Sequence, residues 1–70
     1  MFGSRGYKRN VVEYTIARCS YTDKTTKERK TVNIRFHTYV ENKFELYHLF
    51  KDDYEKFFVH EIIESVYWEE

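Results

Sequence analysis

Residues 57–70 read FFVHEIIESVYWEE, and their secondary structure determines how the whole chain is built. Apolar residues recur here as adjacent pairs every four residues, a spacing that places them on one broad stripe of a helix. Asp52 and Glu55 can form a capping box just before this stripe. We therefore predict a helix over residues 53–67. Its β-branched residues weaken the helix, which leaves a fourth strand over residues 58–68 as the alternative.

Two earlier segments have the pattern of strands. TVNIRFHTYV, residues 31–40, alternates apolar with polar positions, the period of a half-buried strand. VVEYTIARCSY, residues 11–21, is rich in β-branched and aromatic residues, and the polar residues 22–30 between the two runs fit a hairpin loop. We expect these two strands to pair in antiparallel fashion.

Residues 43–50 admit two interpretations. A hairpin turn at residues 41–43 would make them a third strand, in a register that keeps mostly apolar positions on one face. A helix could instead begin at Asn42, with Glu45 completing a capping box. The stripe of that helix would comprise Leu46, Leu49, Phe50, Tyr54 and Phe57. We prefer the strand.

These elements predict an α+β fold, in which a three-stranded antiparallel β-meander carries a C-terminal helix on one face. The alternative is a β-hairpin followed by a helix and a C-terminal strand. Seventy residues make one small domain, 1–70, in which residues 1–9 form a basic, flexible arm. We expect a soluble, cytoplasmic protein without a membrane span, because no window approaches the ~18 apolar residues of a spanning helix. A single cysteine agrees with a reducing compartment.

The formal net charge of zero conceals two oppositely charged halves. Residues 1–40 contain nine basic and three acidic residues, a net charge of +6. Residues 41–70 contain three basic and nine acidic residues, a net charge of −6. We expect the two halves to complement each other in the fold; separate basic and acidic binding surfaces are the alternative.

The sequence contains no catalytic or cofactor motif. Cys19, His37, His48 and His60 do not occur at metal-ligand spacings, and the two glycines lie within the first six residues, away from any phosphate-binding loop. Asp52 and Asp53 fit helix capping better than acid–base catalysis. We therefore predict no enzyme, metal or cofactor. Cys19 should be a small hydrophobic residue of the first strand, and His48 should face inward, with His37 and His60 on the surface.

A protein-binding surface is the first functional prediction. On the predicted helix, Phe57, Glu61, Glu64 and Trp68 form a line on the solvent side, which Glu69 and Glu70 extend. Aromatic residues are enriched in protein interfaces. The carboxylates would select a basic protein partner, and they could do so by occupying a site that the partner uses for nucleic acid. In its small size and aromatic content the chain resembles proteins that phages and mobile elements use to block host factors. Fourteen aromatic residues also predict self-association as a homodimer.

Nucleic-acid binding is the alternative prediction. It would use the N-terminal arm, the loop over residues 22–30 and the outer sheet face. In element order, three strands and a helix resemble the small DNA-binding domains of the integrase N-terminal type. The candidate contacts are Arg5, Tyr7, Lys8, Arg9, Lys27, Arg29, Lys30, Arg35, His37 and Tyr39.

Overall fold

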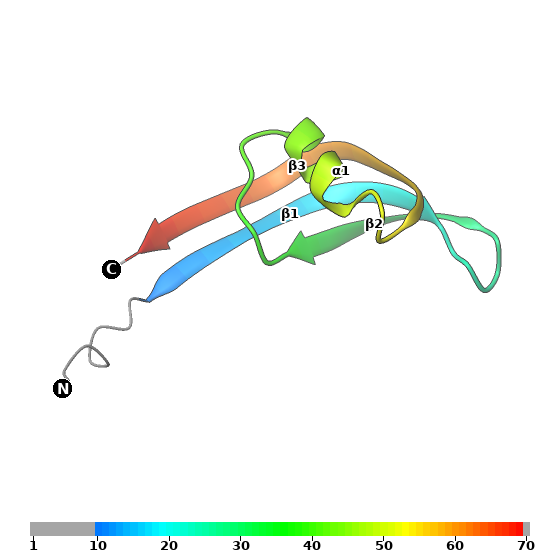
Figure 1. The fold of residues 1–70 in the computed structure, drawn as a ribbon, viewed down its shortest axis with the longest axis horizontal. Helices are drawn as coiled ribbons and strands as arrows, with labels where there is room; N and C mark the ends of the chain where they lie inside the picture. Colours follow the sequence, from blue (N-terminus) through cyan, green and yellow to red (C-terminus); the bar gives the residue numbers. More distant parts are fainter. Residues whose placement is uncertain (1–9, 70) are drawn as a thin grey trace.

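The fold is a three-stranded antiparallel sheet with one helix on one face (Figure 1). A computed structural model of the chain describes residues 10–69. The elements follow in the order β1 (Val11–Thr22), β2 (Arg29–Phe36), α1 (Lys43–Phe50) and β3 (Glu55–Glu69). β1 lies at the centre of the sheet and pairs in antiparallel fashion with both neighbours, so β3 is an edge strand.

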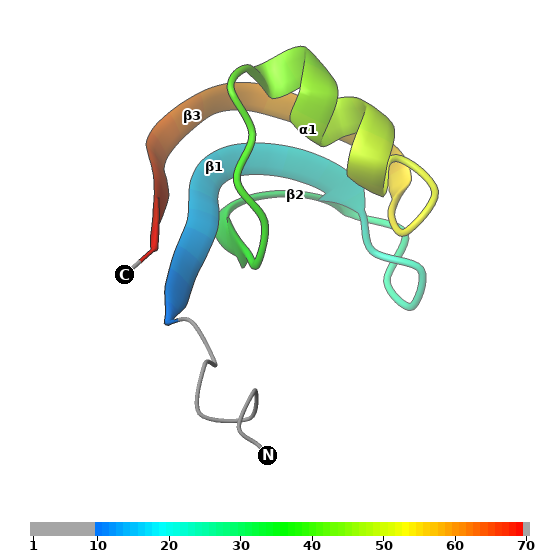
Figure 2. The ribbon, with the colours of Figure 1, turned by 60° about the vertical axis from the view of Figure 1, so that its left-hand side comes forward.

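The sheet bends along its length, and α1 crosses the face that holds the core (Figure 2). Alternate β1 residues, including Thr15, Ala17 and Cys19, point to this face and are fully buried. The core consists of Ala17, Cys19, Phe36, Val40, Leu46, Phe57 and Val59. Aromatic contacts join the helix to the sheet, with ring centroids of Phe36 and Phe50 4.5 Å apart. The opposite face carries no helix within residues 10–69.

The mixed α+β class and the three-stranded antiparallel sheet are confirmed, but the predicted meander is wrong, because the first strand and not the second lies at the centre of the sheet. The helix and the third strand are also exchanged. The predicted helix over residues 53–67 is wrong, because these residues belong to β3. The preferred strand over residues 43–50 is also wrong, because α1 lies there. The observed order is the alternative one, a hairpin followed by a helix and a C-terminal strand.

Irregular pairing explains why β3 has a helix-like apolar spacing. Its register with β1 shifts at three places, and β3 contains one additional residue at each: between Ile16 and Ala17, between Arg18 and Cys19, and between Ser20 and Thr22. A bulge of this kind inserts a residue and moves the following side chains to the other face. The core-facing residues of β3 are consequently spaced two or three apart: Phe57, Val59, Ile62 and Ser65.

The hairpin confirms the two predicted strands and the loop between them, with changed boundaries. β1 ends at Thr22, and Arg29 and Lys30, predicted in the loop, belong to β2. β2 ends at Phe36, so His37 and Tyr39 belong to the connection toward α1. This connection is held by Thr15, whose Oγ1 donates to the Thr38 carbonyl at 2.8 Å. Asp52 and Asp53, predicted to cap a helix, lie in the turn after α1. The predicted basic arm, residues 1–9, lies outside the described residues.

Candidate functional site

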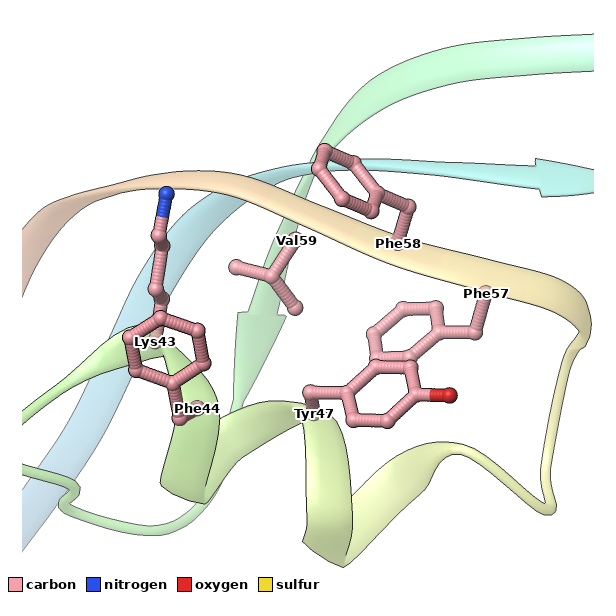
Figure 3. Close-up of a pocket in the computed structure, with 6 residues that line it drawn as sticks. All are labelled: Lys43, Phe44, Tyr47, Phe57, Phe58 and Val59. Carbon is pink, nitrogen blue, oxygen red and sulfur yellow. The ribbon is translucent and has the colours of Figure 1, made fainter.

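An apolar hollow of about 380 Å³ opens between α1 and the first half of β3 (Figure 3). Three residues of the helix and three consecutive residues of the strand line it: Lys43, Phe44, Tyr47, Phe57, Phe58 and Val59. We call these six residues the edge groove. Phe44 is 68% exposed and Phe58 is 50% exposed, although both are large apolar side chains.

The groove lies at the edge of β3 that has no strand neighbour among residues 10–69. Successive residues of a strand point to opposite faces, and Phe57 and Val59 face the core whereas Phe58 is exposed. A hollow that touches all three must therefore lie along the side of the strand. The other side of β3 is paired with β1, in which Ser20 opposes Phe58 and Cys19 opposes Val59.

The start of α1 places the helical half of the groove. The Asn42 side chain caps the helix by accepting a hydrogen bond from the Glu45 N–H at 2.9 Å, and the Glu45 carboxylate accepts one from the Glu41 N–H at 3.1 Å. Residues three and four apart share one side of a helix, so Lys43, Phe44 and Tyr47 face β3 together.

Stacked aromatic rings form the floor of the groove. The rings of Tyr47 and Phe57 lie nearly parallel, with centroids 6.1 Å apart and an interplanar angle of 7°. The Tyr54 ring also stacks on Phe57, with the two ring centroids 5.0 Å apart. Such packing fixes Phe57, which is only 6% exposed, and leaves Phe44 and Phe58 as the projecting walls (Figure 3).

Lys43 is the single charged residue among the six that line the groove. Its Nζ donates to the backbone carbonyl of His60 at 3.4 Å and lies 5.8 Å from the centre of the Phe44 ring. The groove therefore combines aromatic walls with one cation. This arrangement suits a ligand that has an apolar side chain and a carboxylate.

The predicted protein-binding residues lie on both faces of the sheet. Phe57 is in the core, which corrects its predicted exposure on a helix. Glu61, Glu64 and Trp68 oppose Arg18, Ile16 and Val12 of β1, so these three share the uncovered face. Trp68 is 48% exposed. Glu69 is exposed at the end of β3, and Glu70 lies outside the described residues.

The two central carboxylates of that face already have partners within the chain. Glu61 Oε2 lies 2.8 Å from the Arg18 guanidinium. Glu64 Oε2 accepts a hydrogen bond from the Tyr14 hydroxyl at 3.1 Å, and this bond raises the pKa of Tyr14. A charged side chain of the first half thus meets one of the second half across β1 and β3.

The predicted nucleic-acid contacts are dispersed. Arg29 and Arg35 share the uncovered face with Glu61 and Glu64, and the Arg35 guanidinium covers the Tyr14 ring at 4.2 Å. Within the hairpin, Lys30 pairs with Asp23 at 3.0 Å, and Lys27 is exposed in the turn. His37 is exposed and Tyr39 contacts the Tyr67 ring at 5.8 Å. The remaining candidates lie outside the described residues: Arg5, Tyr7, Lys8 and Arg9.

The cysteine and the histidines occupy separate places. Cys19 is buried in the first strand as predicted, and burial raises the pKa of its thiol to about 11. His37 and His60 are exposed as predicted, whereas His48, expected to face inward, is exposed on α1. His60 Nε2 is hydrogen-bonded to Ser20 Oγ, which also contacts Thr31 Oγ1. Over residues 10–69, no group of three or more His, Cys, Asp and Glu side chains could hold a metal ion.

Comparison of the chain with protein-family models, with curated proteins and with solved structures found no match. No helix among the described residues is long and apolar enough to cross a membrane. The candidate site therefore depends on the geometry of this chain alone. Sequence reasoning missed Lys43, Phe44, Tyr47 and Phe58; the capping pattern of Asn42 and Glu45 was the signal that could have located the first three.

Proposed function

We propose that the protein is a small, non-catalytic protein-binding module whose contact surface is the edge groove. The observation that supports this function most strongly is the exposure of Phe44 and Phe58 on both sides of an apolar hollow. Aromatic side chains that border a hollow provide the buried anchor area on which protein interfaces depend. An inhibitor of another protein is one form that such a module can take.

The groove supports this proposal better than the uncovered sheet face does. On that face, Glu61 is paired with Arg18 and Glu64 accepts from Tyr14, so acidic and basic groups alternate over a short distance. Such mixed charge favours neither a nucleic acid nor a uniformly basic partner. A basic partner bound at Glu61, Glu64 and Trp68 is the competing proposal for the contact surface.

Selection from a displayed library of short random peptides tests this function with the complete chain as the target. We expect enrichment of peptides that share a bulky apolar residue. A synthetic peptide of the enriched sequence should lose about tenfold or more in affinity for Phe44→Ser, the size of effect typical of an interface anchor. The measurement is isothermal titration calorimetry.

Leu49→Ser is the matched control. Leu49 is 55% exposed on the same helix but does not line the groove, so the variant should bind within about twofold of the wild type. If no peptide of the library were enriched, the proposed protein-binding function would be contradicted. Loss of binding in Trp68→Ala, with Phe44→Ser unchanged, would move the contact surface to the uncovered face.

A further inference from the structure

We propose that the edge groove receives an extended segment of another protein, which adds to β3 as a fourth strand. One bulky apolar side chain of this segment enters the hollow, and an acidic side chain beside it pairs with Lys43. This inference rests on the proposed function and specifies the conformation and chemistry of the partner.

The backbone of β3 offers the hydrogen-bonding groups that such a segment needs. A strand presents N–H and C=O groups to both sides, and β3 has a strand neighbour only on the β1 side within residues 10–69. Over the same residues, none of the backbone–backbone hydrogen bonds outside the regular elements involves β3. Addition of a strand at such an edge gains main-chain hydrogen bonds whatever the sequence of the incoming segment.

The side chains around this edge supply the selectivity. Adjacent residues of an added strand would point to opposite faces, as they do in β3. A residue that points toward α1 would enter between Phe44 and Tyr47 on the helix and Phe57 and Val59 on the strand (Figure 3). The hollow therefore selects a bulky apolar residue at one position of the segment.

Lys43 controls access to the edge. Its Nζ donates to the His60 carbonyl at 3.4 Å, a long hydrogen bond from a flexible side chain. Lysine side chains at a sheet edge commonly protect it against unwanted pairing, and Lys43 reaches this edge from α1. A carboxylate on the incoming segment would draw the ammonium away and release the His60 carbonyl for an N–H of the new strand. A segment without an acidic residue would have to displace Lys43 without forming a new ion pair. The edge therefore favours acidic segments over neutral ones.

Backbone N-methylation of the enriched synthetic peptide distinguishes strand addition from other modes of binding. N-methylation removes one N–H donor at a time, and only alternate residues of an added strand face its neighbour. We expect losses of about tenfold or more at alternate positions and small effects between them. Equal tolerance at every position, with binding still lost in Phe44→Ser, would overturn strand addition while the protein-binding function stands.

A double-mutant cycle tests the role of Lys43. The first change replaces the peptide's acidic residue by its amide, and the second is Lys43→Met in the protein. Each should lower the affinity, and the two together should lower it by less than the product of the two single fold-losses. Lys51→Met is the control, because Lys51 lies at the other end of α1. If the two substitutions lowered the affinity independently, the proposed ion pair between Lys43 and the acidic residue of the peptide would be overturned. Sedimentation that shows a dimer abolished by Phe44→Ser would overturn the inference by making a second copy the occupant.

Discussion

Cys19 lies at the middle of the sheet, where all three strands meet. It opposes Val32 of β2 and Val59 of β3, and its Sγ lies 3.7 Å from the carbonyl oxygen of Ala17. The side chain is fully buried and the residue behaves as a small hydrophobic group. Burial raises the pKa of its thiol from 9.0 to about 11, so the folded protein keeps this thiol neutral at pH values where an exposed thiol would ionise.

Replacement of Cys19 by serine tests this burial. We expect Cys19→Ser to lower the free energy of unfolding by about 1–3 kcal/mol at pH 7, because a hydroxyl replaces a less polar thiol in the core. The unfolded thiol ionises near pH 9 and the folded one near pH 11, so the wild type loses the contribution of the neutral thiol as pH rises through this range. The difference between wild type and variant should therefore narrow from pH 9 to pH 11. Urea unfolding at several pH values measures it, and a constant difference would contradict the assigned pKa.

At the scale of elements, α1 shows how a short helix is specified by its first residues. Asn42 and Glu45 satisfy backbone N–H groups at its start, whereas its apolar residues do not form one buried stripe. Leu46 is fully buried, but Phe44 and Leu49 are exposed. The cap therefore contributes a large part of what distinguishes this segment from a strand, and it also positions Lys43 and Phe44 beside β3.

Removal of the cap at Asn42 should lower the stability of the fold. We expect Asn42→Ala to lower the free energy of unfolding by about 1 kcal/mol, because the Glu45 N–H loses its acceptor. Asn42→Asp keeps an acceptor at this position and should retain the wild-type stability. Chemical denaturation followed by circular dichroism compares the three proteins. Equal stability of Asn42→Ala and the wild type would show that the cap does not hold the helix.

The same elements show how far the sequence predicted the structure. β1 was predictable from its β-branched and aromatic residues, and β2 from the alternation of apolar and polar residues in its sequence, with a polar loop between them. β3 was not, because its bulges convert a period of two into steps of two and three that imitate a helix. Ile62, Ile63 and Val66 carried the correct signal, since β-branched residues favour strands. The edge groove could not be predicted once residues 43–50 and 53–67 had been assigned to the wrong elements.

At the scale of the whole molecule, one strand from the basic half and one from the acidic half lie side by side. β1 and β3 pair over most of their length, and Arg18 opposes Glu61 at the middle of the pair. Both side chains are about half exposed, so the ion pair contributes little to stability by itself. It does favour the observed register, because a shifted register would no longer place Arg18 opposite Glu61.

Exchange of the two charges tests this arrangement. Glu61→Lys would place two cations opposite each other, and we expect it to lower the free energy of unfolding by roughly 0.5–1 kcal/mol. Arg18→Glu should have a similar effect, because it opposes two carboxylates. The double variant restores an opposite-charge pair and should recover most of the loss, more completely at low salt than at high salt. Thermal unfolding of the four proteins at two salt concentrations measures the coupling. Additive losses in the double variant would mean that Arg18 and Glu61 are not neighbours, and the pairing of β1 with β3 would then have to be reconsidered.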